Sequence, residues 1–212
     1  MIGVLFLAAC LASDLEQDLV AIDRRASEIE AVEAQFIERR YTTLLRAPME
    51  SSGTIRAIAG MVRWDTTTPA RSTTIITESE VRIFYPDDPL LEVWELTSRV
   101  GQLTSSPIPQ IAALRDLFEI APAGGKPGFV TLLLTPLDPL AREHIDHIRL
   151  EIDPSTAVII RVEIGMTDGD RTEIVLDKVK VNTGIKKQDL ALEIPPDTPV
   201  VRRRAPTGNS GQ

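Results

Sequence analysis

The chain has 212 residues, of which 43% are hydrophobic and 25% charged, and its net charge is −8 at pH 7. This length and composition are typical of a single globular domain. The acidic balance, without a dense basic stripe, argues against binding to nucleic acid or to anionic membranes. The single cysteine, Cys10, excludes an internal disulfide and a cysteine-based metal cluster.

The N-terminus contains an apolar run, Ile2 to Ala9, that is far shorter than the roughly 20 residues a membrane span needs. The small residues after it are typical of the end of a secretory signal peptide. Leu7-Ala8-Ala9-Cys10 also resembles a bacterial lipobox, in which the cysteine is lipidated. We therefore predict export to the periplasm, with residues 1–13 as a signal peptide or lipoprotein signal remnant. Cleavage after Ala12 or Ser13 would instead release a soluble protein.

An amphipathic helix is predicted from Asp14 to Val32, because its apolar residues recur at steps of three and four. From Ala34 the pattern changes to a first strand that is expected to end near Pro48. The stretch from Ser52 to Leu96 then carries short β-branched and aromatic runs separated by turn residues, which indicates about five strands. Connections this short favour antiparallel neighbours.

The connection Thr97 to Pro109 leads to a short second helix over residues 108–118, followed by a loop from Ala121 to Gly128. Later strands are predicted from alternating apolar residues, and they are joined by tight turns such as Asp168-Gly169-Asp170. These strands are Phe129 to Thr135, Ile148 to Ile152, Val158 to Met166, the run around Ile174 to Val181, and a last strand at Leu190 to Ile194.

The fold class predicted is mainly β (α+β). It contains a single antiparallel sheet of about 10–11 strands, which must curl or split because of its length. If the sheet curls without closing, its concave apolar face needs cover, and the amphipathic N-terminal helix is a candidate for that cover. One domain spans residues 14–201, and residues 202–212 form a disordered tail.

Candidate catalytic and metal-binding groups are few. His144 and His147 flank Asp146, but no third ligand is evident, so we interpret them as surface residues. Asp168-Gly169-Asp170 lacks the further oxygen ligands of a calcium loop. The serine pairs Ser51-Ser52 and Ser105-Ser106 lack nucleophile-elbow glycines, and the glycines of Gly124-Gly125-Lys126 lack phosphate-loop spacing. We predict no enzyme activity, no metal and no cofactor.

Aromatic residues are concentrated on the central strands, at Trp64, Phe84, Tyr85 and Trp94. Each could simply pack in a core, but together on a curved sheet they could also line a cavity. The residues alone do not separate these alternatives.

The order of these segments resembles the periplasmic outer-membrane lipoprotein carrier (LolA-like) family over roughly Leu15 to Val201. The matching stretches include the helix, Val32-Glu-Ala-Gln-Phe36, Ser52-Gly53-Thr-Ile, Gly60-Met-Val-Arg63-Trp64-Asp, Val-Arg-Ile-Phe84-Tyr85-Pro86, and Ile194-Pro195-Pro196. Where the family often has a basic residue and a proline before the Gly60 stretch, this chain has Ile58-Ala59.

The resemblance implies a single strongly curved antiparallel sheet that forms an unclosed barrel, lidded by the N-terminal amphipathic helix and the short second helix. The hydrophobic cavity of this barrel is expected to hold lipoprotein acyl chains. The implied partners are an inner-membrane lipoprotein-releasing ABC transporter and an outer-membrane receptor, with the carrier itself a monomer. The cavity is expected to be lined by Phe36, Ile55, Val62, Trp64, Ile83 and Tyr85. Cys10, as a lipidation candidate, favours an alternative: an anchored receptor (LolB-like) or a lipoprotein-sensing regulator of the same fold. A lipid hydrolase would need a nucleophile and a base, and neither is evident.

Overall fold

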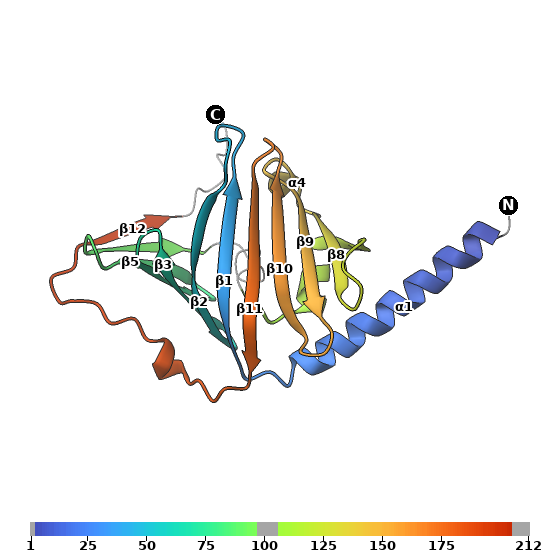
Figure 1. The fold of residues 1–212 in the computed structure, drawn as a ribbon, viewed down its shortest axis with the longest axis horizontal. Coiled ribbons are helices and arrows are strands. Elements are labelled where there is room, and N and C mark those ends of the chain that lie inside the picture. Colours follow the sequence, from blue (N-terminus) through green and yellow to red (C-terminus); the bar gives the residue numbers. More distant parts are fainter. Residues whose placement is uncertain (1–2, 97–105, 205–212) are drawn as a thin grey trace. The chain divides into compact units, whose positions relative to one another are not determined.

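The computed structural model describes residues 3–96 and 106–204, with side chains described from Leu15 to Arg203 within these ranges. Twelve strands form a mainly antiparallel sheet in the order β12-β6-β5-β4-β3-β2-β1-β11-β10-β9-β8-β7 (Figure 1). Strands β12 and β7 end this order, so the sheet is unclosed. The strands are β1 (Ala31–Tyr41), β2 (Met49–Ile58), β3 (Met61–Thr68), β4 (Ser72–Thr77), β5 (Glu80–Tyr85), β6 (Leu90–Glu95), β7 (Phe118–Pro122), β8 (Val130–Pro136), β9 (Ile145–Asp153), β10 (Val158–Met166), β11 (Arg171–Val181) and β12 (Val200–Arg204).

The described helices are α1 (Gly3–Ala26), α3 (Ile111–Arg115), α4 (Pro139–Arg142) and the 3-10 helix η1 (Lys187–Leu190). The mainly β fold class, the unclosed sheet, the N-terminal helix and the second helix are therefore confirmed. The N-terminal helix ends at Ala26 rather than Val32, because β1 begins at Ala31. The predicted connection at 97–105 and most of the predicted tail lie outside the described residues.

Three segments differ from the sequence prediction. The strand predicted at Leu190 to Ile194 is wrong: Leu190 is the last residue of η1 and is fully buried, and residues 191–194 continue outside the sheet. Strand β12 runs from Val200 to Arg204 and pairs with β6 in parallel, so residues 202–204 form a strand where the disordered tail was expected to begin. Strand β7 replaces the end of the predicted second helix and the start of the predicted loop. These additions bring the strand count to twelve.

The chain divides into two compact units that interleave in sequence. Unit 1 comprises residues 1–29, 40–47 and 108–174, and unit 2 comprises residues 30–39, 48–107 and 175–212. In unit 1, Leu132, Leu150 and Ile152 of β8 and β9 are buried together with Leu19 and Ile22 of α1 and with Ile111 and Leu114 of α3. The Asp23 carboxylate accepts a hydrogen bond from the Ile111 backbone N–H at 3.0 Å, which joins α1 to α3.

Unit 2 is a run of tight antiparallel hairpins from β2 to β6, with β12 added beside β6. The β2–β3 turn contains only Ala59 and Gly60, and Gly60 adopts a φ of 71°, which glycine reaches without strain. Within β2, a Cβ atom at Gly53 would lie 1.9 Å from the Asp65 carbonyl oxygen, so only glycine allows the two backbones to approach there. The close approach of β2 and β3 therefore explains why a glycine stands at the centre of Ser52-Gly53-Thr.

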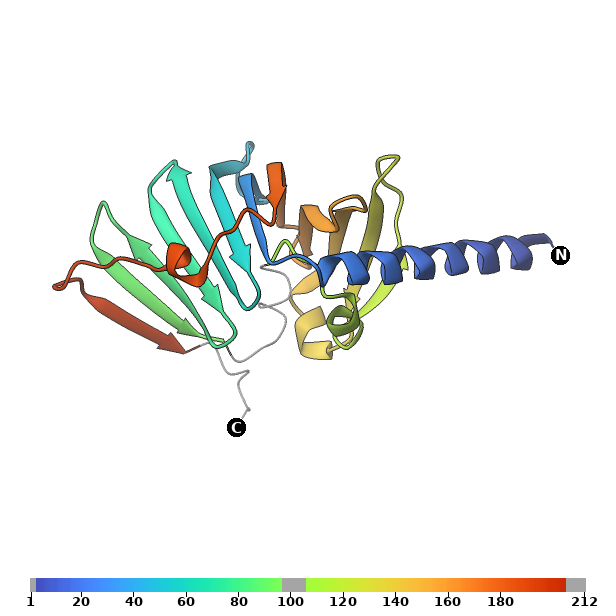
Figure 2. The same ribbon diagram turned by 90° about the horizontal axis from the view of Figure 1, so that it is seen from below.

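A segment that we call the strap, residues 182–199, leaves β11 and runs across the strands of unit 2 before β12 begins (Figure 2). It carries η1, and its Leu192 and Ile194 pack against a buried cluster of Phe84, Leu91 and Val93. The alternation of Leu190, Leu192 and Ile194 thus marks a chain that covers the sheet, not a strand within it.

Candidate functional site

Strand register places the predicted cavity residues of β2, β3 and β5 on one face of unit 2. Directly paired residues of antiparallel strands share a face, and every second residue of a strand returns to it. The pairs Ile55↔Trp64 and Ala57↔Val62 join β2 to β3, and Trp64↔Thr74 and Thr74↔Ile83 carry this face across β4 to β5. Tyr85 lies two residues after Ile83 on the same face. Together with Phe36 of β1, which contacts Trp64, we call this set the apolar face: Phe36, Ile55, Val62, Trp64, Ile83 and Tyr85.

Phe36 and Trp64 join β1 to the rest of the apolar face. Their ring centroids lie 4.8 Å apart with an interplanar angle of 72°, an edge-to-face contact that adds stabilisation beyond simple burial. Phe36, Ile55 and Val62 are buried, whereas Trp64, Ile83 and Tyr85 are half-buried. The apolar face therefore has a packed base near β1 and β2 and partly accessible side chains toward β5.

The opposite face of the same strands carries a polar network centred on Asp65, beside the buried cluster of Phe84, Leu91 and Val93. Its carboxylate accepts hydrogen bonds from Arg56 at 2.7 Å, from Arg63 at 2.8 Å and from the Thr73 hydroxyl at 2.9 Å. Burial opposes the ionised carboxylate, but the donors from Arg63, Arg56 and Thr73 outweigh it and hold the pKa of Asp65 below its ordinary value. Asp65 is thus a stable anion shared by two guanidinium groups.

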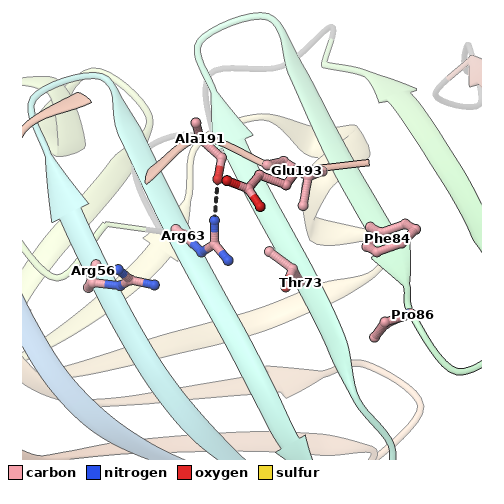
Figure 3. Close-up of a pocket in the computed structure, with 8 residues that line it drawn as sticks. Arg56, Arg63, Thr73, Phe84, Pro86, Ala191 and Glu193 are labelled. Atoms are coloured by element: carbon pink, nitrogen blue, oxygen red, sulfur yellow. Dashed lines mark hydrogen bonds between the residues drawn. The ribbon is translucent and has the colours of Figure 1, made fainter. Parts of the chain in front are cut away.

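The two arginines also hold the strap. Arg63 donates to the Ala191 carbonyl oxygen (Figure 3), and Arg56 donates to the Asp189 carbonyl oxygen at 3.3 Å. A cavity of about 260 Å³ remains beside these contacts, lined by Arg56, Arg63, Thr73, Phe84, Pro86, Ala191, Leu192 and Glu193. The strap thus covers the side of unit 2 opposite the apolar face, through its contacts with the two arginines and with the cluster of Phe84, Leu91 and Val93.

The Arg56–Asp65–Arg63 network was not among the sequence-predicted site residues. Arg63 and Asp65 are two residues apart on one strand, which places them on one face, but only the β2–β3 register shows that Arg56 lies directly opposite Arg63. Two neighbouring residues of the Gly60-Met-Val-Arg63-Trp64 stretch therefore have different roles. Trp64 belongs to the apolar face, and Arg63 holds the strap.

The remaining candidate residues occupy separate places in unit 1. His147 contacts Asp146 at 2.8 Å and Glu163 at 3.7 Å. Asp168-Gly169-Asp170 forms the β10–β11 turn, where Asp170 accepts a hydrogen bond from the Thr43 backbone N–H. Among the described residues, no group of three or more His, Cys, Asp or Glu side chains could hold a metal ion.

Cys10 lies within α1, at a position whose side chain falls outside the described residues. In the part of the chain that the structure describes, no helix combines the length and the apolar character that a membrane span requires.

Comparison with known proteins gives one family and several structural neighbours. A search of curated proteins finds no match. An uncharacterized conserved protein from Thermus thermophilus superposes with a TM-score of 0.55 and 16% sequence identity, over 89% of this chain and 98% of that chain. The MucA/MucB complex of Pseudomonas aeruginosa contains a chain that superposes with a TM-score of 0.50 and 14% identity, over 85% of this chain and 61% of that chain. At these identities the likeness shows the fold alone.

The family model described as "Outer membrane lipoprotein carrier protein LolA" matches residues 27–189. The match begins just before β1 and ends within η1, so it includes every residue of the apolar face and both arginines that hold the strap. The chain therefore belongs to the LolA family of outer membrane lipoprotein carrier proteins.

Proposed function

We propose that this protein is a periplasmic carrier that binds the acyl chains of lipoproteins on the apolar face of unit 2 and shuttles them toward the outer membrane. The observation that carries the proposal is the gathering of Phe36, Ile55, Val62, Trp64, Ile83 and Tyr85 on one face, in a chain of the LolA family. Implied partners are an inner-membrane lipoprotein-releasing ABC transporter and an outer-membrane receptor.

The physical basis is burial of hydrocarbon without catalysis. Each acyl CH₂ group removed from water contributes about 0.8 kcal/mol, so a chain only partly covered by the apolar face is still held firmly. Release requires a second site of comparable affinity and no chemical step in this chain. The half-buried state of Trp64, Ile83 and Tyr85 in the free protein leaves surface on which an acyl chain can gain contacts.

The test is direct measurement of bound lipid. Protein purified from the periplasm of its native host is expected to release acyl-containing molecules on extraction and mass spectrometry. The emptied protein is expected to bind the apolar dye N-phenyl-1-naphthylamine, and palmitate should displace the dye in a saturable manner. Protein that binds neither the dye nor palmitate, while retaining its circular dichroism spectrum, would refute the carrier proposal.

A second candidate function is regulation or reception of lipoproteins by an anchored protein with the same fold. The likeness to a chain of the MucA/MucB complex favours it, because that neighbour is recorded in a complex with another protein. This chain spans 61% of that neighbour's length, so the likeness leaves more than a third of the neighbour without a counterpart here.

Cys10 provides the means to separate the two candidates. If Cys10 is lipidated in the native host, the protein partitions into detergent and its N-terminal peptide carries an acyl mass. Cys10→Ser is then expected to abolish both properties while leaving dye binding unchanged. A mature protein that begins after Cys10 and stays in the aqueous phase would contradict the anchored receptor and agree with the shuttle.

A further inference from the structure

Trp94 places an unused hydrogen-bond donor on the same side of the sheet as the apolar face. It lies on β6 opposite Val81 of β5, and Val81 is two residues from Ile83. The Trp94 indole Nε1–H is buried and has no acceptor in the part of the chain that the structure describes. An unsatisfied buried donor carries the full penalty of its lost hydration, so an oxygen atom brought next to Nε1 would recover that free energy.

A charged pair from β6 and β12 lies beside the Trp94 ring. The Arg203 guanidinium lies 5.3 Å from the centroid of the Trp94 ring and 3.3 Å from the Glu92 carboxylate. The Arg203 side chain is 50% exposed, whereas that of Glu92 is 16% exposed. One contact with Glu92 leaves further N–H groups of the guanidinium able to bind a ligand oxygen, because arginine carries several donors.

Tyr85 belongs to the same neighbourhood. Burial and then the negative charge of Glu92 raise the pKa of Tyr85, against the opposing charge of Arg203, so the phenol stays neutral at physiological pH. Glu92 itself is paired with Ile83 across β5 and β6, where Ile83 forms part of the apolar face. Polar groups therefore gather where the apolar face reaches β6. We call Tyr85, Glu92, Trp94 and Arg203 the polar corner.

We propose that the polar corner binds the carbonyl end of the acyl ligand, with Trp94 Nε1–H donating to the carbonyl oxygen and Arg203 donating to a second ligand oxygen. This inference rests on the proposed function, and it adds an orientation: the hydrocarbon lies along the apolar face toward Trp64, and the oxygens lie at β6. Because Glu92 balances Arg203, the polar corner carries no net charge. An uncharged ester fits it as well as a carboxylate.

Three probes test the donor. Palmitate and 1-monopalmitoylglycerol both carry an acyl carbonyl, whereas N-phenyl-1-naphthylamine carries none. Trp94→Phe keeps an aromatic ring and removes the N–H group. It is expected to raise the Kd of both acyl probes about two- to tenfold, the range of one hydrogen bond, and to leave the dye unchanged. The inference would be overturned if Trp94→Phe weakened the binding of all three probes equally, or if it changed the binding of neither acyl probe.

Two further variants complete the experiment. Trp64→Phe, on the same side of the sheet, is the control and is expected to affect the three probes alike. Arg203→Gln alters a half-exposed side chain and should weaken palmitate; unchanged palmitate binding would count against the assignment of Arg203. If Trp94→Phe weakens the binding of palmitate but not of 1-monopalmitoylglycerol, the polar corner recognises the charge of the ligand and not its carbonyl group. If wild-type protein binds none of the probes, the proposed function itself fails.

Discussion

Replacing Trp64 by glutamate is expected to weaken palmitate and dye binding at least about tenfold while the protein remains folded. Trp64 is half-buried at the centre of the apolar face, so its position is partly accessible to water in the free protein. An acyl chain seated there would strip water from the new carboxylate, which then bears a large desolvation cost or must take up a proton. The expected result is measured by dye displacement and isothermal titration calorimetry at pH 7.

The fold itself should survive this change with a moderate loss of stability. Trp64→Glu removes the edge-to-face contact with Phe36, which is worth about 0.5–1.5 kcal/mol beyond the lost burial. Thr67→Glu, an exposed position on the same strand, is the matched control and should leave binding and melting temperature nearly unchanged. A Trp64→Glu protein that unfolds outright would mean that Trp64 belongs to a closed core. A folded variant with wild-type affinity would remove Trp64 from the binding site.

Asp65→Ala is expected to destabilise the protein by about 2–3 kcal/mol. The change deprives Arg56 and Arg63 of the carboxylate that they share in a partly buried setting, and hydrogen bonds to charged groups are worth about 1.5–3 kcal/mol each. The free energy of unfolding from urea titration measures the effect. Asp87→Ala breaks an exposed pair with Arg71 and is the control, for which little change is expected.

The pH dependence of the Asp65 effect follows from the direction of its pKa shift. The pKa of Asp65 in the folded protein lies below the ordinary value of 3.8, so the folded state binds this proton less readily than the unfolded chain does. The stabilisation is therefore complete above the ordinary pKa and is lost as the pH falls through the folded pKa. The difference in unfolding free energy between wild type and Asp65→Asn should shrink below about pH 4. A difference that stays constant there would show that the charge of Asp65 is not responsible.

The shared face of Ile55, Val62, Trp64, Ile83 and Tyr85 could be predicted from the sequence because a strand has a side-chain period of two. Once Ile55, Trp64 and Ile83 are assigned to neighbouring strands with tight turns, their common face follows from the period and the register. The same logic failed at Leu190, Leu192 and Ile194. Alternating apolar residues describe any extended chain with one buried side, whether it lies in a sheet or across it.

The polar network and β12 could not be predicted from the residue pattern of any single strand. Arg56 reaches Asp65 only through the pairing of β2 with β3, and Arg203 reaches Trp94 only because the chain returns after the strap to run parallel to β6. A parallel return needs a long connection, and residues 182–199 supply it without the periodicity of a helix. The basic residues after Val201 therefore gave no sign, from the sequence alone, that they belong to a strand.

The return of the chain as β12 also decides which strand lies at this edge of the sheet. Strand β6 reads Leu-Leu-Glu-Val-Trp-Glu, and left unpaired it would present a ladder of backbone groups that a second copy could extend into a larger sheet. Strand β12 occupies that ladder with five residues and brings Arg202 and Arg203 to the terminal position. Short, charged terminal strands discourage pairing with their own copies, so β12 is expected to reduce edge-to-edge association through β6 in a protein whose proposed cargo is hydrophobic.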